Sequence, residues 1–255
     1  MKIAISGKGG VGKTTISGTL CRLLGRKGHP VLAIDGDPNP NLSVVLGIKG
    51  KQEPAPLNSA ELLERVEGDD GKQRVQLVGS LEEVLNSHGV QAPDNVTLLM
   101  LGKPEHAGTG CMCGAHAVIR EVVHAAVAES DRLTVLDMEA SLEHMKRGTA
   151  KYVDALYIVV EPYYRSLEAA NRIQALAKEL GIKQIAGIAN KVRNAEDEEA
   201  VKDFCERIEL PLNCIIPFDE HVLQAERAGT TVIDLNGQSA ALHRLTELAD
   251  AILAP

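Results

Sequence analysis

The residues best suited to chemistry lie within the first fifteen positions, where a lysine and two threonines follow closely spaced glycines. Their spacing matches the phosphate-binding pattern G-x-x-x-x-G-K-[ST], which is filled here by Gly7-Lys8-Gly9-Gly10-Val11-Gly12-Lys13-Thr14 and followed by Thr15. Glycines let the backbone turn so that successive N–H groups point inward and surround an anion. We expect Lys13 to reach the β- and γ-phosphates of a nucleotide and the Thr14 hydroxyl to bind Mg²⁺.

This loop needs a strand before it and a helix after it, and the sequence supplies both. A short apolar run, residues 2–6, precedes the loop, and a helical pattern over residues 13–28 closes at Gly28. The positive N-terminal end of that helix would face the bound phosphate. A glycine-rich turn without a ligand is the alternative, but every chemically required position is filled in the right context.

Two acids follow other apolar runs. Residues 31–35 read as a buried strand that delivers Asp37 onto the loop beyond its carboxyl end, the edge at which open parallel sheets bind ligands. Asp37 would then lie near the γ-phosphate; alternatively, Asp37 and Asn39 only cap the turn that follows. Residues 133–137 form a strand pattern ending in an acid, as in Walker B motifs, and Asp137 would bind Mg²⁺ through water.

Two cysteines one residue apart, Cys111 and Cys113, lie in a glycine-rich stretch, residues 102–114. Thiolates are the preferred ligands of Zn²⁺, Cu(I) and iron–sulfur clusters. Two thiolates do not complete a tetrahedral site, but a twofold dimer would supply four, two from each chain. His106 and His116 are nearby donors that we expect to be solvated. Two unrelated buried thiols are the alternative.

The composition narrows the classes of function. The chain has 255 residues, 44% of them hydrophobic, which suits one large α/β domain. A net charge of −8 argues against a broad nucleic-acid or anionic-lipid surface, and four Tyr, two Phe and no Trp argue against a stacking platform for single strands. The sequence contains no run of about 18 apolar residues, so we expect no membrane span. The first strand begins at once, so we expect no signal peptide. Five cysteines, an odd number, favour reduced thiols and a cytoplasmic location.

The order of the patterns predicts a mostly parallel, twisted sheet with helices on both faces, in a single α/β domain over residues 1–255. Residues 47–79 are rich in Gly, Pro and charge and carry one short helical pattern, residues 59–66, so we expect a surface insertion there. The last segment, residues 239–253, has apolar residues at helical spacing, and we expect it to pack on the sheet rather than to bind lipid. Further strands are expected over residues 96–101, 155–160, 184–189 and 212–216, and further helices over residues 81–85, 115–129 and 222–228 and in a segment ending at residue 180.

The lysine early in the phosphate loop marks a subclass. Residues 8–15, Lys-Gly-Gly-x-Gly-Lys-Thr-Thr, resemble the deviant Walker A motif of the MinD/ParA and nitrogenase iron-protein class. The resemblance implies that Lys8 reaches across a dimer to the partner's nucleotide, so that ATP closes a homodimer; a solvated loop lysine is the alternative. It also implies that Asp37 lies in switch I and orients the attacking water or the magnesium shell. Lys8, Lys13 and Asp37 are thus the expected catalytic residues.

The same resemblance completes the nucleotide site at two strand ends. In related ATPases an asparagine at the end of the strand over residues 184–189 hydrogen-bonds the adenine, and the segment after the strand over residues 212–216 lies against the base. Packing of Phe218 into the core is the alternative for that residue. The expected nucleotide-binding residues at these two ends are Asn190, Lys191, Pro217, Phe218 and Asp219.

A second resemblance is closer. The Cys-x-Cys pair followed by Asp-Met-Glu-Ala-x-x-Glu-His-x-x-Arg-Gly, residues 137–148, is similar to the CooC-type nickel-inserting ATPases, which mature carbon monoxide dehydrogenase and its acetyl-CoA synthase relatives. The resemblance covers nearly the whole chain and departs at Ser141, where the family usually has glycine. It implies a cytoplasmic, dimeric Mg-ATPase that forms ADP and phosphate, holds Ni²⁺ or Zn²⁺ between Cys111 and Cys113 of both chains, and serves one of those two enzymes as client.

Two other functions stay open on the sequence. Four thiolates across a dimer would also hold a [4Fe–4S] cluster, as in the nitrogenase iron protein. Those proteins usually draw the second cysteine from the switch II side, however, and residues 137–148 contain none. A positioning role in the MinD/ParA manner is the other alternative, against which the acidic charge and the mixed charges of the last helix argue.

Overall fold

One sheet organises the chain. The computed structural model describes residues 1–37, 39–48, 55, 57, 62–67, 71, 73–101, 113–128, 132–138 and 152–254, and of residues 113–116, 127 and 128 it describes the backbone alone. Within these residues an eight-stranded sheet forms in the order β10-β9-β8-β1-β7-β2-β6-β5, parallel throughout except for the pair β5–β6. Its strands are β1 (Lys2–Gly7), β2 (Val31–Asp35), β5 (Val90–Ala92), β6 (Val96–Met100), β7 (Leu133–Asp137), β8 (Ala155–Val160), β9 (Gln184–Val192) and β10 (Leu212–Pro217).

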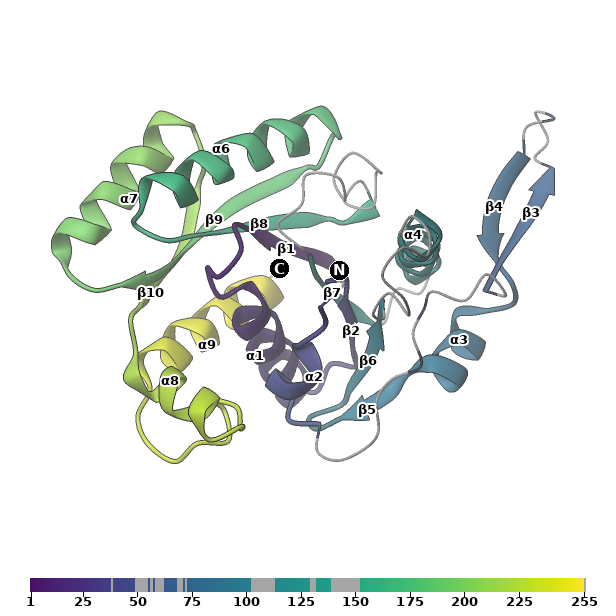
Figure 1. The fold of residues 1–255 in the computed structure, drawn as a ribbon, viewed down its shortest axis with the longest axis horizontal. Coiled ribbons are helices and arrows are strands. Elements are labelled where there is room, and N and C mark those ends of the chain that lie inside the picture. The colour runs from purple at the N-terminus through teal and green to yellow at the C-terminus, as the bar shows by residue number, and fades with distance from the viewer. Residues whose placement is uncertain are drawn as a thin grey trace.

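Helices cover both faces of this sheet (Figure 1). One face packs against α3 (Leu81–His88), α4 (Cys113–Ala128), α6 (Tyr164–Glu179) and α7 (Ala195–Arg207). The other packs against α1 (Lys13–Arg26), α2 (Leu42–Val45) and α9 (Ala240–Leu253), with α8 (Glu220–Arg227) beside them.

The strands are apolar on both sides because both faces are covered. In β2, Leu32 and Ile34 join one core cluster while Val31 and Ala33 join the other. Parallel sheets with two covered faces give such continuous apolar runs rather than alternating patterns. The predicted fold class, a mostly parallel α/β sheet with helices on both faces, is confirmed.

The helix after the phosphate loop begins and ends as the sequence indicates. Helix α1 runs from Lys13 to Arg26, and Gly28 just beyond it has a positive φ of 93°. A left-handed glycine after the last turn is a common helix stop. At the other end of the chain, α9 buries Leu245, Leu248 and Ile252, so the predicted packing of the last helix on the sheet is also confirmed.

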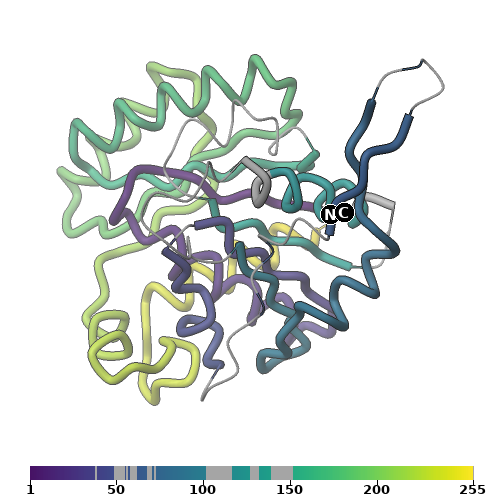
Figure 2. The backbone as a smooth tube through the Cα atoms, turned by 45° about the vertical axis from the view of Figure 1, so that its right-hand side comes forward, coloured from purple at the N-terminus to yellow at the C-terminus, as the bar shows by residue number. Residues whose placement is uncertain are grey.

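The predicted helix over residues 59–66 is wrong where the structure describes it. Residues Leu63–Glu67 form strand β3, which pairs antiparallel with β4 (Gln73–Leu77). The hairpin projects away from the sheet (Figures 1 and 2), and its base packs beside α4. The local sequence permits a helix, but pairing with β4 satisfies the backbone of β3, and that partner is invisible in a local pattern.

Among the described residues, no helix combines the length and the apolar character needed to cross a bilayer.

Candidate nucleotide site

The phosphate loop is shaped by glycine and by a neighbouring strand. Gly12 precedes α1 with φ of 96°, a conformation that side chains disfavour, and a Cβ there would lie 2.4 Å from Nδ2 of Asn190. Val11 is buried, whereas Lys8, Gly9 and Gly10 are exposed. Only glycine therefore fits position 12, and the outer part of the loop is open to a ligand or a partner.

Lys13 lies inside the loop, as the motif predicts. It is 8% exposed, and its Nζ donates a hydrogen bond to the carbonyl oxygen of Lys8 at 3.3 Å. The Val11 N–H points to the same oxygen, at 3.4 Å. A cation and an N–H group thus converge on one oxygen, which is the donor arrangement that a phosphate oxygen requires. Thr14 and Thr15 follow in the first turn of α1, both half-buried.

Two buried acids stand next to the loop. Asp35 and Asp137 end neighbouring strands and are paired in the register of β2 with β7, each 1% exposed. Asp137 accepts hydrogen bonds from the Ser17 hydroxyl, at 3.0 Å, and from the Thr14 hydroxyl. Ser17 was not predicted from the sequence. Its position one helical turn beyond Lys13, on the same side of the helix, is the signal that could have identified it.

Burial dominates the electrostatics of this acid pair. The pKa of Asp137 is raised to about 7 and that of Asp35 to about 6. Desolvation is the largest cause for both, and at Asp137 the nearby Asp35 carboxyl group adds to it while hydrogen bonds from Thr14 and Ser17 and the charge of Lys13 oppose it. Ionised carboxylates are therefore short of compensating positive charge here. A Mg²⁺ ion between Thr14 and Asp137 would supply that charge, so these residues fit the magnesium that the motif predicts.

The loop after β2 is held by Asp35 rather than by Asp37. Asp35 accepts hydrogen bonds from the backbone N–H groups of Asp37, Asn41 and Leu42, at 3.2, 3.0 and 2.9 Å. The half-buried Asp37 accepts a local bond from the Asn39 N–H, at 2.8 Å. The cap of α2 thus comes from Asp35, which sequence reasoning did not assign, and a catalytic role for Asp37 stays a prediction.

Strand β9 meets the phosphate loop directly. The strand continues past the predicted end at residue 189 to Val192, and Asn190 donates from Nδ2 to the carbonyl oxygen of Val11 at 2.7 Å. Lys191 donates from Nζ to the carbonyl oxygen of Gly10 at 2.6 Å and forms an ion pair with Glu161 at 2.7 Å. The contact of Asn190 with adenine stays a prediction.

The three residues predicted to lie against the base, at the end of β10, each make different contacts. Pro217 ends the strand, and the guanidinium of Arg193 lies 3.8 Å from the centre of the half-buried Phe218 ring. Asp219 caps α8 by accepting from the His221 N–H and also accepts from the Ser239 hydroxyl and the Ala241 N–H of α9. Burial alone would raise the pKa of Asp219, but these hydrogen bonds lower it to about 2. Its carboxylate therefore braces two helix starts, and contact with the base stays a prediction.

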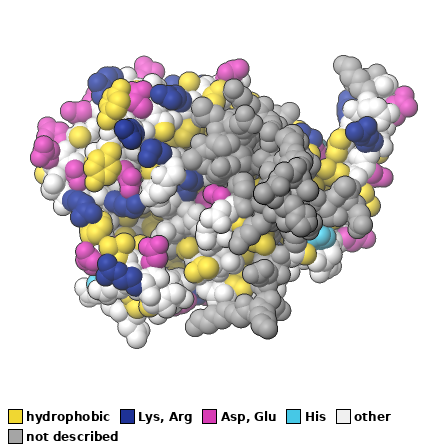
Figure 3. All heavy atoms as spheres, viewed as in Figure 1, with side chains coloured by type: hydrophobic (Ala, Val, Ile, Leu, Met, Phe, Trp, Pro, Cys, Tyr) yellow, Lys and Arg dark blue, Asp and Glu magenta, His cyan; other side chains and the backbone are white. Residues whose placement is uncertain are grey.

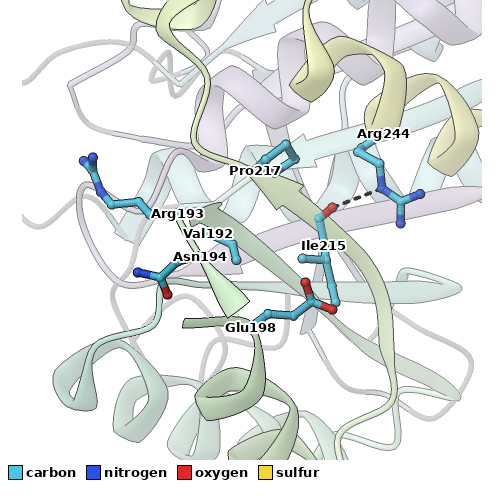
Figure 4. A pocket seen from close by; sticks show the side chains of 7 residues that line it. All are labelled: Val192, Arg193, Asn194, Glu198, Ile215, Pro217 and Arg244. Atoms are coloured by element: carbon cyan, nitrogen blue, oxygen red, sulfur yellow. Dashed lines mark hydrogen bonds between the residues drawn. The ribbon is translucent and has the colours of Figure 1, made fainter. Parts of the chain in front are cut away.

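A pocket of about 350 Å³ opens beside these strand ends (Figure 4). It lies along the outer edge of the sheet, where Arg244 of α9 donates from Nε to the carbonyl oxygen of Ile215 at 3.1 Å. Its lining comes from the ends of β9 and β10 and the start of α7, together with Arg244: Val192, Arg193, Asn194, Glu198, Ile215, Pro217 and Arg244.

The predicted thiolate site falls largely outside the described residues. Cys111, His106 and the switch II residues 139–148, Ser141 among them, are not described; Cys113 is the first residue of α4, but its side chain and that of His116 are not. Among the described residues, no three His, Cys, Asp or Glu side chains are placed to hold a metal ion. The thiols that are described, Cys21, Cys205 and Cys214, are all buried, and burial raises the pKa of each, to about 11 for Cys205 and Cys214, which makes them poor ligands.

Charges on the surface are mixed. On the face shown in Figure 3, described Lys and Arg side chains are interspersed with Asp and Glu side chains over α6 and α7. A mixed surface of this kind does not favour one charged polymer over another.

The fold and this loop define a class of protein, and comparison with known sequences names it. Residues 2–232 match the family of the CobQ/CobB/MinD/ParA nucleotide binding domain, and the chain belongs to that family. It is a P-loop ATPase.

Two relatives and one solved structure make the comparison finer. The carbon monoxide dehydrogenase accessory protein CooC of Rhodospirillum rubrum is 37% identical over 92% of this chain and 90% of its own length. An uncharacterized ATP-binding protein of Methanocaldococcus jannaschii is 38% identical over 94% and 93%. The septum site-determining protein MinD of Pyrococcus horikoshii, solved with Mg-ADP, has the same fold, with a TM-score of 0.73 at 24% identity over 99% and 96% of the two chains. The resemblance to CooC-type accessory ATPases is thereby confirmed.

Proposed function

We propose that this ATPase delivers nickel to carbon monoxide dehydrogenase or to an acetyl-CoA synthase, as a homodimer that holds the metal between the thiolates of Cys111 and Cys113 from both chains. The observation that carries the proposal is the similarity to CooC over nine tenths of both proteins. The Cys-x-Cys pair immediately before the buried core of α4 adds to it. The cytoplasm, where thiols stay reduced, is the proposed location.

The position of α4 supports coupling between metal and nucleotide. Cys113 begins this helix, and Ile119, less than two turns further on, is buried in the core of the sheet. The Ile119 Cδ1 atom lies 3.8 Å from where a Cβ on Gly36 would be, in the loop between Asp35 and Asp37. We therefore expect a displacement of the loop after β2 to shift α4, the helix that begins at Cys113.

This contact suggests a sequence of events. ATP brings two chains together through the exposed Lys8, and the closure sets the two cysteine pairs into one four-thiolate site. Hydrolysis relaxes switch II, the segment after Asp137, and opens the site so that the metal passes to the client. Zinc would bind the same four thiolates in a purified sample, because tetrahedral thiolate sites suit it.

Metal binding tests this function. Protein purified without oxygen should take up Ni²⁺ or Zn²⁺ and raise the activity of a nickel-free client in an ATP-dependent manner. The double variant Cys111→Ala/Cys113→Ala should lose both properties, whereas Cys205→Ala, which removes a buried thiol, should keep them. Unchanged metal uptake in the double variant would contradict the proposal. A brown, iron-containing protein would instead identify the electron-transfer alternative.

A further inference from the structure

We propose that Lys191, held by Glu161, is a positioning residue of the phosphate loop, which orients the loop's N–H groups toward the phosphates without touching the nucleotide itself. The inference concerns ATP binding and hydrolysis and does not depend on metal delivery. Neither residue belongs to the phosphate-loop motif, and Glu161 has no part in the site predicted from the sequence.

Two consecutive residues of β9 hold two consecutive carbonyl groups of the loop. The Lys191 ammonium lies 2.6 Å from the carbonyl oxygen of Gly10, and the Asn190 amide nitrogen lies 2.7 Å from that of Val11. Both donors approach the loop from β9, at the end of the strand. The backbone from Gly10 to Gly12 is therefore fixed from outside at two adjoining peptide groups.

Peptide geometry turns this hold into an orientation. In a trans peptide the C=O and the following N–H point in opposite directions, and the described part of the chain, which includes this loop, contains no cis peptide bond. With the Gly10 oxygen held by Lys191, the Val11 N–H must point to the other side, where it meets the Lys8 oxygen beside the Lys13 ammonium. The Val11 oxygen held by Asn190 sets the Gly12 N–H in the same way. Inward N–H groups are what make the loop an anion site.

The backbone of Lys191 is itself unusual. Its φ is 59°, in the left-handed region that residues with a Cβ disfavour. A glycine would adopt this φ more easily but would carry no ammonium group. Strained residues of this kind persist where the surrounding structure requires them, often at functional sites.

Glu161 is the second partner of the Lys191 ammonium. It follows β8, which neighbours β9 in the sheet, and its carboxylate lies 2.7 Å from the Lys191 Nζ. The Glu161 side chain is 17% exposed and the Lys191 side chain 40%, so the pair sits at the rim of the site rather than in the core. The Glu161 backbone is tied in turn, since its N–H donates to the Ser166 hydroxyl at 3.0 Å.

The test separates a hold on the loop from a contact with the base. Affinities for ADP and AMP should be measured for Lys191→Met and Glu161→Gln by displacement of a fluorescent nucleotide. Loss of the hold should weaken ADP roughly tenfold, the size expected for a charge-assisted hydrogen bond, and leave AMP nearly unchanged because AMP lacks the β-phosphate. The double variant should be no weaker than Lys191→Met alone, since Glu161 acts through the lysine.

A matched exposed pair serves as control. Lys27 and Asp250 form an ion pair at 2.5 Å at the far end of α1, so Lys27→Met and Asp250→Asn should leave both affinities unchanged. Lys191→Gly removes the ammonium and also the backbone strain, so it should fold at least as stably as Lys191→Met while binding ADP as weakly as that variant. Equal weakening of AMP and ADP, or unchanged ADP affinity in Lys191→Gly, would overturn the proposal.

Discussion

Two carboxyl groups at the ends of β2 and β7 are the most strongly perturbed acids of the site. Both carboxylate oxygens of Asp35 accept hydrogen bonds from backbone N–H groups of its own loop, whereas Asp137 accepts them from hydroxyl groups of α1. Burial is the main cause of their raised pKa values, and at Asp137 the nearby Lys13 ammonium offsets it only in part. Mg²⁺ bound with a nucleotide would supply further positive charge.

Asp137 should make the nucleotide-free protein less stable as the pH rises. Its pKa is 3.8 when unfolded and about 7 when folded, so between these values the folded state binds more protons. The stabilisation is complete below the unfolded value and is lost as the pH rises through about 7, at up to about 1.4 kcal/mol per pH unit. Urea unfolding with a chelator present should show this fall for the wild type.

The variant Asp137→Asn provides the comparison for that experiment. Since asparagine does not titrate, the wild type should lose stability relative to the variant between about pH 5 and about pH 7.5. Parallel curves for the two proteins would show that Asp137 does not titrate in this range. Adding Mg²⁺ with ADP should reverse the trend for the wild type, because the cation favours the ionised carboxylate.

Helix α1 connects the nucleotide site with the opposite edge of the sheet and packs unusually closely there. A Cβ on Gly25 would lie 1.7 Å from the carbonyl oxygen of Asp94, an atom of the backbone that cannot rotate away. The adjoining Arg22 is buried and bonds Asp94 and Asp234. The last turns of α1 are thus held by a close backbone contact and by a buried ion pair.

Gly25→Ala should therefore destabilise the protein, although alanine is the better helix former by about 1 kcal/mol. Overpacking in a filled site costs about 1–3 kcal/mol, which exceeds the gain in propensity. Thermal or urea unfolding of the variant and the wild type measures the difference in their free energies of unfolding. The neighbouring Arg26→Ala removes only exposed ion pairs with Asp94 and Asp234 and should cost less than about 1 kcal/mol. A stabilised Gly25→Ala variant would contradict the packing described here.

The sequence predicts elements well where a run is buried on both sides. Strands β2, β7 and β8 begin and end where their apolar runs do, because a fully covered parallel strand has no polar positions to blur its ends. The hairpin β3–β4 is exposed along most of its length and depends on a pairing partner, so local periodicity misreads it as a helix. Tertiary pairing overrides propensity in such segments.

Some residues of the nucleotide site can likewise be predicted from the sequence, and others cannot. Lys13 and Asp137 are predictable from motifs, since each motif keeps its chemistry within one short segment. The sequence does not predict the roles of Ser17, Asp35 and Glu161. Each of these residues acts through a group from another element or through a backbone conformation. Ser17 lies 120 positions from Asp137 in the sequence, and Glu161 contributes only through Lys191.

At the scale of the whole molecule, we propose that residues 47–79 are a surface insertion on a single domain spanning residues 1–255. Leu62 and Leu77, at the base of its hairpin, are buried in the core, whereas the described residues further out are mostly exposed. The described hairpin is therefore anchored at its base, and Leu57, also within the insertion, is buried and donates its N–H to the carbonyl oxygen of Met100 at 2.9 Å.

Replacing residues 64–76 by a short Gly-Ser link should leave the ATPase rate within about twofold of the wild type, because loop changes of this size alter stability only slightly. Leu62 and Leu77 stay in place as the anchor. Initial rates of ATP hydrolysis and midpoints of thermal unfolding should be measured for the shortened protein and the wild type. Loss of ATP hydrolysis with an intact fold would show that the hairpin belongs to the catalytic unit.

The proposed function rests on the pairing of two molecules. In this proposal, the exposed Lys8 and the cysteines Cys111 and Cys113 at the start of α4 act only when a second chain supplies the other half of the site. The most direct measurement is the mass of the metal-loaded protein in solution, by light scattering together with metal analysis, with a non-hydrolysable ATP analogue and with ADP. The account predicts twice the chain mass with the analogue and one metal ion for every two chains, and loss of that metal in Cys111→Ala/Cys113→Ala. A single-chain mass in both nucleotide states, with one metal ion per chain, would contradict it.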